Sequence, residues 1–322
     1  MKKLTAFLLV STVLVAFAND LEQKVKSLQN KAVAGTITVK DSNNILYSVN
    51  ELQHLSKGSL VNGRVASVSA CNRKNNAAVI PALETFHKDL KALNIELIVI
   101  PVPPKLAIMP AAGMKQGEAM KYLKPFYQEL RAKNINVLDL SDLYLKSGAG
   151  LYCRTDAHWS PAGIALAVKE LAKQIKLRGS SNFQIAESEI TISGDLAKSL
   201  NPSTPETEKI KIKTVSGKTI TEDTPVLLLG DSHTLIFSTG GIMLSSNGGL
   251  AEQLAAELKM PVDRMGVMGS ASTVVRINLF RKASKNPEWL KNKKYVIYCF
   301  TAREFTESPA GWVKVPVLRK KR

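Results

Sequence analysis

Residues 225–234 read Pro-Val-Leu-Leu-Leu-Gly-Asp-Ser-His-Thr, and this stretch decides the fold class. An apolar run of this length that ends in glycine is typical of a buried β-strand followed by a tight turn. Ser232 comes directly after that turn, where its hydroxyl would stand clear of the strand. The alternative is an ordinary strand-to-helix connection in which Ser232 caps the helix.

Four further segments are similarly rich in apolar residues, and amphipathic segments separate them. The predicted strands cover residues 96–101, 135–140, 262–268 and 295–300, and the predicted helices cover residues 79–93, 120–134, 160–177 and 250–258. Fully apolar strands that alternate with helices indicate a parallel sheet covered on both faces. The sequence therefore predicts an α/β fold of three layers, with ligands bound beyond the carboxyl ends of the strands.

The remaining segments give the predicted domain boundaries. Residues 1–18 have a positive start, an apolar run and the small-residue pattern Ala16-Phe17-Ala18, which is the layout of a cleaved secretory signal peptide. An uncleaved membrane anchor is the alternative. We expect a small N-terminal cap over residues 19–76 and a main domain over 77–316, with a polar, β-rich insertion at 179–224. A basic tail follows at 317–322.

The charge balance points to a polyanionic partner. The chain of 322 residues carries a formal net charge of +17, which becomes +15 once residues 1–18 are removed. A basic protein attracts polyanions and anionic surfaces over long range. Export argues against nucleic acid, and no nucleic-acid-binding motif is present. The three cysteines, Cys71, Cys153 and Cys299, have no metal-site spacing, and the sequence leaves their pairing open.

A second motif, Thr155-Asp156-Ala157-His158-Trp159-Ser160-Pro161, supplies the partners that a reactive serine needs. A serine hydroxyl is a weak nucleophile until a base removes its proton, and imidazole titrates near neutral pH. A carboxylate on the other ring nitrogen holds the tautomer. His158 and Asp156 are therefore the candidate base and its partner, and His54 and His87 are expected at the surface. A metal site is disfavoured because one aspartate and one histidine are too few ligands.

The two motifs together resemble the SGNH hydrolase superfamily. The Asp156–His158 block precedes Ser232 here, and that order resembles the AlgX/AlgJ alginate O-acetyltransferase group, whose SGNH-like domain is circularly permuted. The stretch at 155–161 is the most specific match. Positions 233 and 234 are His and Thr, where the superfamily more usually has Phe and Ser.

The resemblance implies roles for particular residues. Ser232 would be the nucleophile, His158 the base and Asp156 its partner, and no cofactor is implied. The candidates for the oxyanion hole and for substrate binding are the Ser232 backbone N–H, Gly269, Ser270, Arg303, Tyr152, Arg154 and His233. For Arg303 a surface salt bridge is the alternative, and His233 would point either away from the site or at substrate.

Three functions follow as expectations. The first is an exported, periplasmic or secreted O-acetyltransferase that moves acetyl groups through Ser232 onto hydroxyls of an alginate-like acidic exopolysaccharide. A membrane-bound acyltransferase partner would present the acetyl donor. The second is a carbohydrate acetyl-esterase with the same triad, because the two differ only in how well the site excludes water. The third is a non-catalytic, polysaccharide-binding subunit of an export complex. The sequence leaves the oligomeric state open.

Overall fold

A computed structural model of the chain describes residues 20–148 and 150–319. The predicted signal peptide and residues 320–322 of the predicted tail lie outside the described residues. Every helix among the described residues is too short or too polar to traverse a lipid bilayer.

A parallel five-stranded sheet forms the centre of the molecule, in the order β4-β3-β9-β7-β8. Its strands are β3 (Glu96–Val102), β4 (Asn136–Val137), β7 (Val226–Gly230), β8 (Asp263–Gly266) and β9 (Tyr295–Thr301). All residues of β7 and β9 are buried. Because β7 lies between β9 and β8, the serine that follows β7 comes out at the carboxyl edge among neighbouring strand ends.

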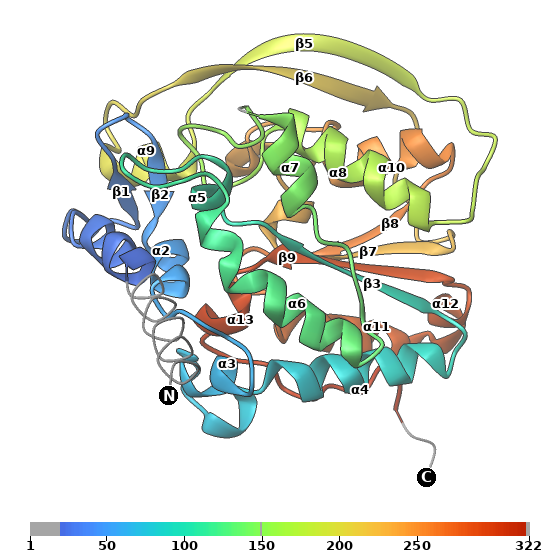
Figure 1. Ribbon diagram of the computed structural model, residues 1–322. Coiled ribbons are helices and arrows are strands. Elements are labelled where there is room, and N and C mark those ends of the chain that lie inside the picture. The colour runs from blue at the N-terminus through green and yellow to red at the C-terminus, as the bar shows by residue number, and fades with distance from the viewer. Residues whose placement is uncertain (1–19, 149, 320–322) are drawn as a thin grey trace, which may run out of the picture.

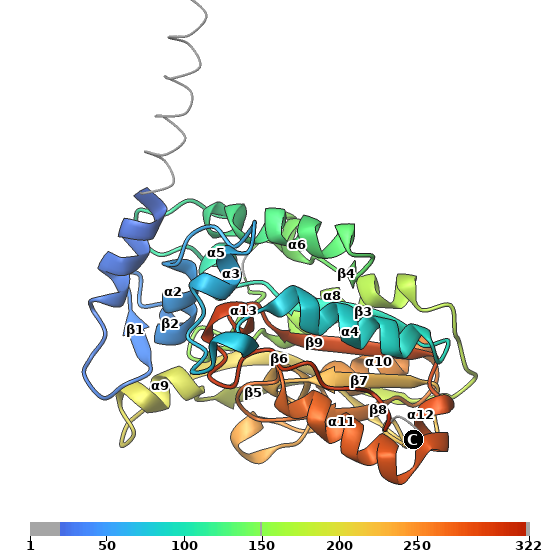
Figure 2. The ribbon, with the colours of Figure 1, turned by 90° about the horizontal axis from the view of Figure 1, so that it is seen from below.

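Helices cover both faces of this sheet (Figures 1 and 2). One face carries α4 (Val79–Lys91) and α11 (Val274–Lys285), and the other carries α8 (Pro161–Gln174) and α10 (Leu250–Leu258). Each helix packs an apolar stripe inward, as Leu83, Phe86 and Leu90 of α4 do. Further helices are α6 (Leu123–Ala132), α7 (Ser141–Ser147), α12 (Pro287–Lys291) and α13 (Glu304–Glu307), with 3₁₀ turns η2 (Glu118–Lys121), η3 (Ser232–Thr234) and η4 (Gly241–Met243). The prediction of a three-layer α/β fold is confirmed.

The predicted insertion at 179–224 contains a long antiparallel hairpin. Strands β5 (Gln184–Ile192) and β6 (Glu208–Ser216) pair over their whole length, and helix α9 (Asp195–Leu200) lies in the connection between them. The hairpin arches over the outer side of α8 and α10 (Figure 1). It therefore reaches from one end of the molecule to the other while staying outside the central sheet.

The N-terminal segment packs into the same core as the sheet and does not form a separate body. It contains β1 (Thr38–Lys40), β2 (Leu46–Ser48), α2 (Val49–Leu55), α3 (Arg64–Ser67) and η1 (Lys74–Asn76), after a helical stretch over residues 20–29. Leu21, Leu52 and Val65 belong to one continuous apolar cluster with the sheet strands. The segment lies beside α5 (Lys105–Ile108), which follows the carboxyl end of β3 (Figure 2).

Two predictions from the sequence need correction. The strand predicted at 135–140 has only two paired residues, because Leu138–Leu140 turn into α7. His54 was expected at the surface but is 2% exposed, and its ring lies 2.7 Å from the hydroxyl of Thr306. Its helix α2 is covered by α13, which the spacing of apolar residues in α2 alone does not reveal.

Candidate active site

The turn after β7 places Ser232 at the carboxyl edge of the sheet. Gly230 ends the strand where a Cβ atom would lie 1.9 Å from the carbonyl oxygen of Cys299, so the neighbouring strand leaves room for glycine only. Asp231 then accepts hydrogen bonds from the backbone N–H groups of His233 (2.8 Å) and Thr301 (2.7 Å). These bonds tie the turn to the end of β9 and hold the serine in a fixed position.

The loop before α8 brings His158 to that serine. The Nε2 atom of His158 lies 2.7 Å from the Oγ atom of Ser232, and its Nδ1 atom lies 2.5 Å from Oδ1 of Asp156. An ionised carboxylate only accepts hydrogen bonds, so Nδ1 carries the proton and Nε2 is free to accept from the serine hydroxyl. The three side chains that the sequence singled out form one hydrogen-bonded chain.

Asp156 is fully engaged as an acceptor. Its Oδ1 also accepts the backbone N–H of His158 (2.8 Å), and its Oδ2 accepts the backbone N–H of Asp195 (2.9 Å). Burial raises the pKa of the carboxyl, but the charge and hydrogen bonds of His158 and the Asp195 N–H outweigh burial, so the pKa falls below its ordinary value. Asp156 is therefore an anion at neutral pH.

The imidazole of His158 sits among three carboxylates. Burial lowers its pKa, while the charge and hydrogen bond of Asp156 and the charges of Asp195 and Asp231 raise it, and the net pKa lies above the ordinary value. The surrounding carboxylates therefore stabilise the protonated form of the His158 ring. Such stabilisation is what a general base next to a serine requires.

Asp195 is a residue that the sequence analysis missed. It begins α9 in the inserted hairpin, and its Oδ1 accepts the backbone N–H of Ala157 (2.8 Å). Gly194 permits this approach, because a Cβ atom there would lie 2.4 Å from the Cβ of Asp156. No local pattern marks the pair, since the contacts of Asp195 with Ala157 and Asp156 span 38 and 39 residues of sequence, and only the fold brings them together.

Asp195 also raises the question of a metal site. One ligand atom each from Asp156, His158 and Asp195 lie within 4.8 Å of one another. Both ring nitrogens of His158 already have partners, however, and a metal ion would displace either the bond to Asp156 or the bond to Ser232. The donor set thus fits a proton-transfer chain better than a metal centre.

Glu208 is a second missed residue, and it anchors the same loop. Its carboxylate accepts the backbone N–H groups of Arg154 (2.9 Å) and Thr155 (2.7 Å) and the hydroxyl of Thr155 (2.6 Å). Glu208 is the first residue of β6, so the inserted hairpin holds the histidine loop from outside. The insertion is therefore part of the site's framework.

Two candidates for substrate contact require correction. Tyr152 is 4% exposed, and its hydroxyl donates to the carbonyl oxygen of Pro103 inside the protein. His233 is 2% exposed; its Nδ1 atom lies 3.1 Å from Asp231, and its ring packs against His158 with centroids 4.6 Å apart. Both side chains are buried and engaged by contacts within the protein, so they pack behind the loop that carries His158.

The other candidates lie nearer the surface. Arg154 is occupied by an ion pair with Glu206 at 2.7 Å. Gly269 is exposed, with φ of +84°, in the loop after β8, whereas the hydroxyl of Ser270 donates to Glu304. Arg303 is half-buried at the end of β9, and across residues 20–148 and 150–319 its guanidinium forms no ion pair. Its charge opposes the rise in the pKa of three nearby carboxyls, those of Glu51, Asp195 and Glu304.

The backbone N–H of Ser232 is available as a hydrogen-bond donor. It donates no hydrogen bond within the part of the chain that the structure describes. The loop at Gly269 follows β8, which pairs with β7 up to Gly230, and the N–H of Val267 donates to the Gly230 carbonyl at 3.0 Å. The loop and the serine turn therefore leave the sheet side by side.

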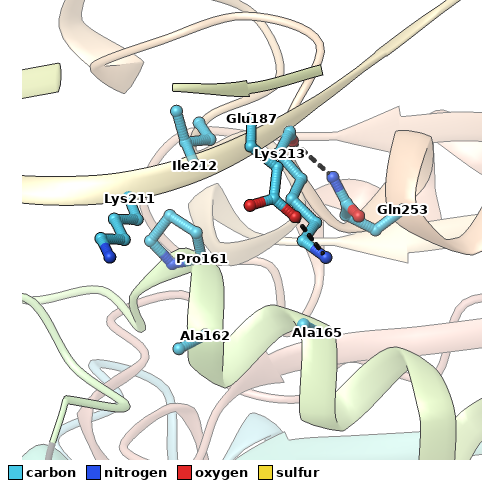
Figure 3. Close-up of a pocket in the computed structure, with 8 residues that line it drawn as sticks. All are labelled: Pro161, Ala162, Ala165, Glu187, Lys211, Ile212, Lys213 and Gln253. Atoms are coloured by element: carbon cyan, nitrogen blue, oxygen red, sulfur yellow. Dashed lines mark hydrogen bonds and ion pairs between the residues drawn. The ribbon is translucent and has the colours of Figure 1, made fainter. Parts of the chain in front are cut away.

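A pocket of about 320 Å³ lies beneath the inserted hairpin, outside the triad. Figure 3 shows its walls: the first turns of α8 on one side and β6 on the other, with Gln253 of α10 at the end. Lys213 forms an ion pair with Glu187 at 2.8 Å, whereas Lys211 has no such partner among the described residues. The lining residues are Pro161, Ala162, Ala165, Glu187, Lys211, Ile212, Lys213 and Gln253.

Comparison with known proteins identifies the family. A family model described as "SGNH hydrolase-like domain, acetyltransferase AlgX" matches residues 64–297, which is most of the chain. The chain belongs to this family. The resemblance drawn from the two motifs is thereby confirmed.

Individual relatives agree with that assignment. A probable alginate O-acetylase AlgJ from Pseudomonas fluorescens is 30% identical over 130 residues, which are 37% of this chain and 32% of that protein. The match thus spans about a third of the relative's length. Among solved structures, the O-acetyltransferase domain of Pseudomonas putida AlgJ superimposes with a TM-score of 0.61 at 16% identity, covering 84% of this chain and 92% of that one. Pseudomonas aeruginosa AlgX gives 0.59 at 17% identity, covering 85% and 64%. Both share the fold of this chain.

Proposed function

We propose that this protein is a polysaccharide O-acetyltransferase that carries the acetyl group on Ser232. The observation that carries the proposal is the 2.7 Å contact between the Ser232 hydroxyl and the unprotonated Nε2 of His158, with Asp156 behind it. The description of the family as an acetyltransferase and the alginate O-acetylase relative support the reaction class.

The reaction runs as two acyl transfers. His158 takes the hydroxyl proton of Ser232 while Oγ bonds to the acetyl carbonyl carbon of the donor ester. The tetrahedral intermediate collapses, the donor C–O bond breaks, and the departing alcohol takes the proton from His158. A sugar hydroxyl then gives its proton to His158, attacks the acetyl-serine, and Ser232 leaves with that proton. Each step returns the triad to its starting charge.

The negative oxygen of each intermediate needs hydrogen-bond donors. The free N–H of Ser232 is one, and the N–H of Gly269 in the adjacent loop is the second in our proposal. Donors preorganised in a site that excludes water are worth several kcal/mol of transition-state stabilisation each.

The acceptor in this proposal is an acidic polysaccharide. Arg303 at the edge of the site and Lys211 in the pocket are cations without ion-pair partners among the described residues. Pro161 lies three residues after His158, so its Cα is within about 11 Å of the histidine Cα. The pocket is therefore only a few sugar units away from Ser232. A polysaccharide bound across Ser232 would extend into the pocket and place one of its carboxylates near Lys211.

A transfer assay tests the proposal. The protein without residues 1–18 is incubated with an activated acetyl ester, with and without oligouronate. Acetylated oligouronate supports the transferase, and release of acetate alone supports an esterase. Inertness toward both would leave the non-catalytic binding role. Ser232→Ala should lower either activity about 10³-fold or more without changing the melting temperature, and undiminished turnover in that variant would reject Ser232 as nucleophile.

The polysaccharide contact has its own test. Lys211→Ala should raise the KM for oligouronate about 3- to 10-fold, leave kcat for a small acetyl ester unchanged, and matter less at high salt. Lys218→Ala is the matched control, because Lys218 is an exposed lysine just past the end of β6 that does not line the pocket. Equal KM values for the two variants would remove the pocket from the acceptor path.

We place the protein outside the cytoplasm in this proposal, with a membrane acyltransferase as the source of the acetyl donor. The sequence of residues 1–18 supports export. Detection of the intact segment 1–18 on protein recovered from the cell exterior would contradict its cleavage.

A further inference from the structure

Lys105 is a buried cation that the proposed chemistry does not use. It is 1% exposed and begins α5, just after the turn Pro103–Pro104 that ends β3. A lysine is rarely buried unless its amino group has partners, because desolvating the charged group is costly. The hydrogen-bond partners of the Lys105 amino group therefore indicate its role.

Those partners are the backbone of the histidine loop. The Nζ atom donates to the carbonyl oxygens of Arg154 and Asp156, each at 3.0 Å. These two carbonyls flank Thr155, and the second belongs to the residue that orients His158. One amino group therefore holds two peptide groups, 154–155 and 156–157, which lie before and after the α-carbon of Asp156.

The N-terminal segment holds Lys105 in place. The carboxylate of Glu51 in α2 accepts the backbone N–H groups of Lys105 (3.0 Å) and Leu106 (2.9 Å), which are unpaired donors at the start of α5. Glu51 is itself only 5% exposed. A chain of contacts thus runs from α2 through α5 to the loop that carries Asp156.

The charges agree with this arrangement. Burial lowers the pKa of Lys105, and the charges of Asp156, Glu51 and Glu208 are among those that oppose the decrease. Burial raises the pKa of Glu51, and the N–H groups of Leu106 and Lys105 and the charges of Arg303 and Lys105 oppose that increase. The two buried groups stabilise each other's ionised form, and removing either leaves the other without that support.

We propose that Lys105 is a positioning residue for the triad, and that Glu51 makes the N-terminal segment part of the catalytic framework. The proposal rests on the proposed role of Ser232, His158 and Asp156. Without the Nζ atom, the two carbonyls lose their donor, and the peptide planes of the loop can reorient by rotation about φ and ψ. A displacement of about 1 Å at a catalytic group costs roughly 100-fold in rate.

The molecule offers a matched control. Lys293 is the other buried lysine of the described residues, and its Nζ atom also donates to two carbonyls two residues apart, those of Glu222 (2.6 Å) and Thr224 (2.9 Å). It has Asp263 as an additional partner at 2.8 Å. Lys293 lies two residues before β9, at the opposite end of that strand from the site. Its amino group therefore also bridges two backbone carbonyls, but not those of the loop that carries His158.

The experiment compares Lys105→Met with Lys293→Met. For each folded variant we measure the melting temperature, the rate at which a fluorophosphonate labels Ser232, and kcat and KM for a small acetyl ester. We expect both variants to lose stability, and Lys105→Met alone to lose about 100-fold in labelling rate and kcat with KM little changed. Equal rates in the two variants would overturn the proposal and leave Lys105 a structural residue.

A second variant covers the case in which Lys105→Met does not fold. Glu51→Gln keeps one acceptor oxygen for α5 and leaves Lys105 intact, so it should fold and slow Ser232 labelling about 10-fold. Wild-type labelling in Glu51→Gln would overturn the link to the N-terminal segment. Labelling reports the triad alone, so a wild-type protein that is labelled but transfers no acetyl group to sugar would contradict the proposed function and leave this proposal standing.

Discussion

Asp156→Asn is the substitution for which the structure gives the sharpest prediction. Three N–H groups converge on this carboxylate: the ring Nδ1–H and backbone N–H of His158 on Oδ1, and the backbone N–H of Asp195 on Oδ2. An asparagine has one acceptor oxygen and one NH₂ group. Whichever way the amide turns, its NH₂ group meets at least one N–H donor.

The two orientations have different costs. With its oxygen toward His158, the amide opposes the N–H of Asp195 and pushes the inserted segment away. With its NH₂ group toward His158, it forces Nδ1 to become the acceptor and moves the ring proton to Nε2, where it can no longer accept the proton of Ser232. The same change in a comparable triad lowers kcat by about 10⁴, which corresponds to roughly 5.5 kcal/mol of activation free energy. Stability should fall by about 1–3 kcal/mol for one buried donor left unpaired.

The assay is hydrolysis of a small acetyl ester, measured for enzyme that retains a cooperative melting transition. Asp195→Asn is the control, because Oδ1 of Asp195 accepts a single N–H group from Ala157 that an amide oxygen can also accept. It should lose far less activity than Asp156→Asn. If Asp156→Asn keeps more than a tenth of the wild-type kcat, the assignment of Asp156 as the residue that sets the His158 tautomer is wrong.

Three further outcomes follow from the same contacts. The charge of Asp195 raises the pKa of His158, and the proposed reaction needs the unprotonated ring. Asp195→Asn should therefore shift the acid limb of the pH profile of kcat/KM to lower pH. An acid limb at the wild-type pH would exclude an effect of the Asp195 charge on the pKa of His158. Gly194→Ala adds a methyl group 2.4 Å from the Cβ of Asp156, so we expect about a 10-fold loss of kcat and a lower melting temperature. Wild-type values for kcat and melting temperature would show that the loop moves to accommodate the methyl group without affecting the site. Burial, with smaller contributions from the charges of Lys57 and Arg303, lowers the pKa of His54 from 6.5 to about 3, so its folded pKa lies below the unfolded one. The contribution of neutral His54 to the free energy of unfolding is therefore greatest above pH 6.5, and it decreases by about 1.4 kcal/mol per pH unit as the pH falls toward 3. Denaturant titrations of the wild type and of His54→Gln should differ in the pH dependence of the unfolding free energy by that slope.

The apolar runs and the two motifs were enough to predict the fold class and to single out Ser232, His158 and Asp156, which hydrogen bonds join in the structure. Residues 226–230 and 295–301 are buried throughout, and a strand with no polar face needs layers on both sides, wherever it lies in the sheet. The serine after the first run and the Asp–His pair before Pro161 are local patterns, each complete within a few residues. Such features depend on periodicity and chain chemistry, which a single sequence displays.

The support of the triad depended on tertiary structure. Asp195, Glu208 and Lys105 touch the histidine loop from 39, 53 and 51 residues away, and His54 is buried by a helix 252 residues later in the chain. The same fold turned Tyr152 and His233 inward, although their positions beside the motifs suggested substrate contact. The sequence alone specifies which side chains can react and which segments are apolar. The groups that bury those side chains, hold them in place and shift their pKa values come from distant parts of the chain, so they are decided only when the loops pack together.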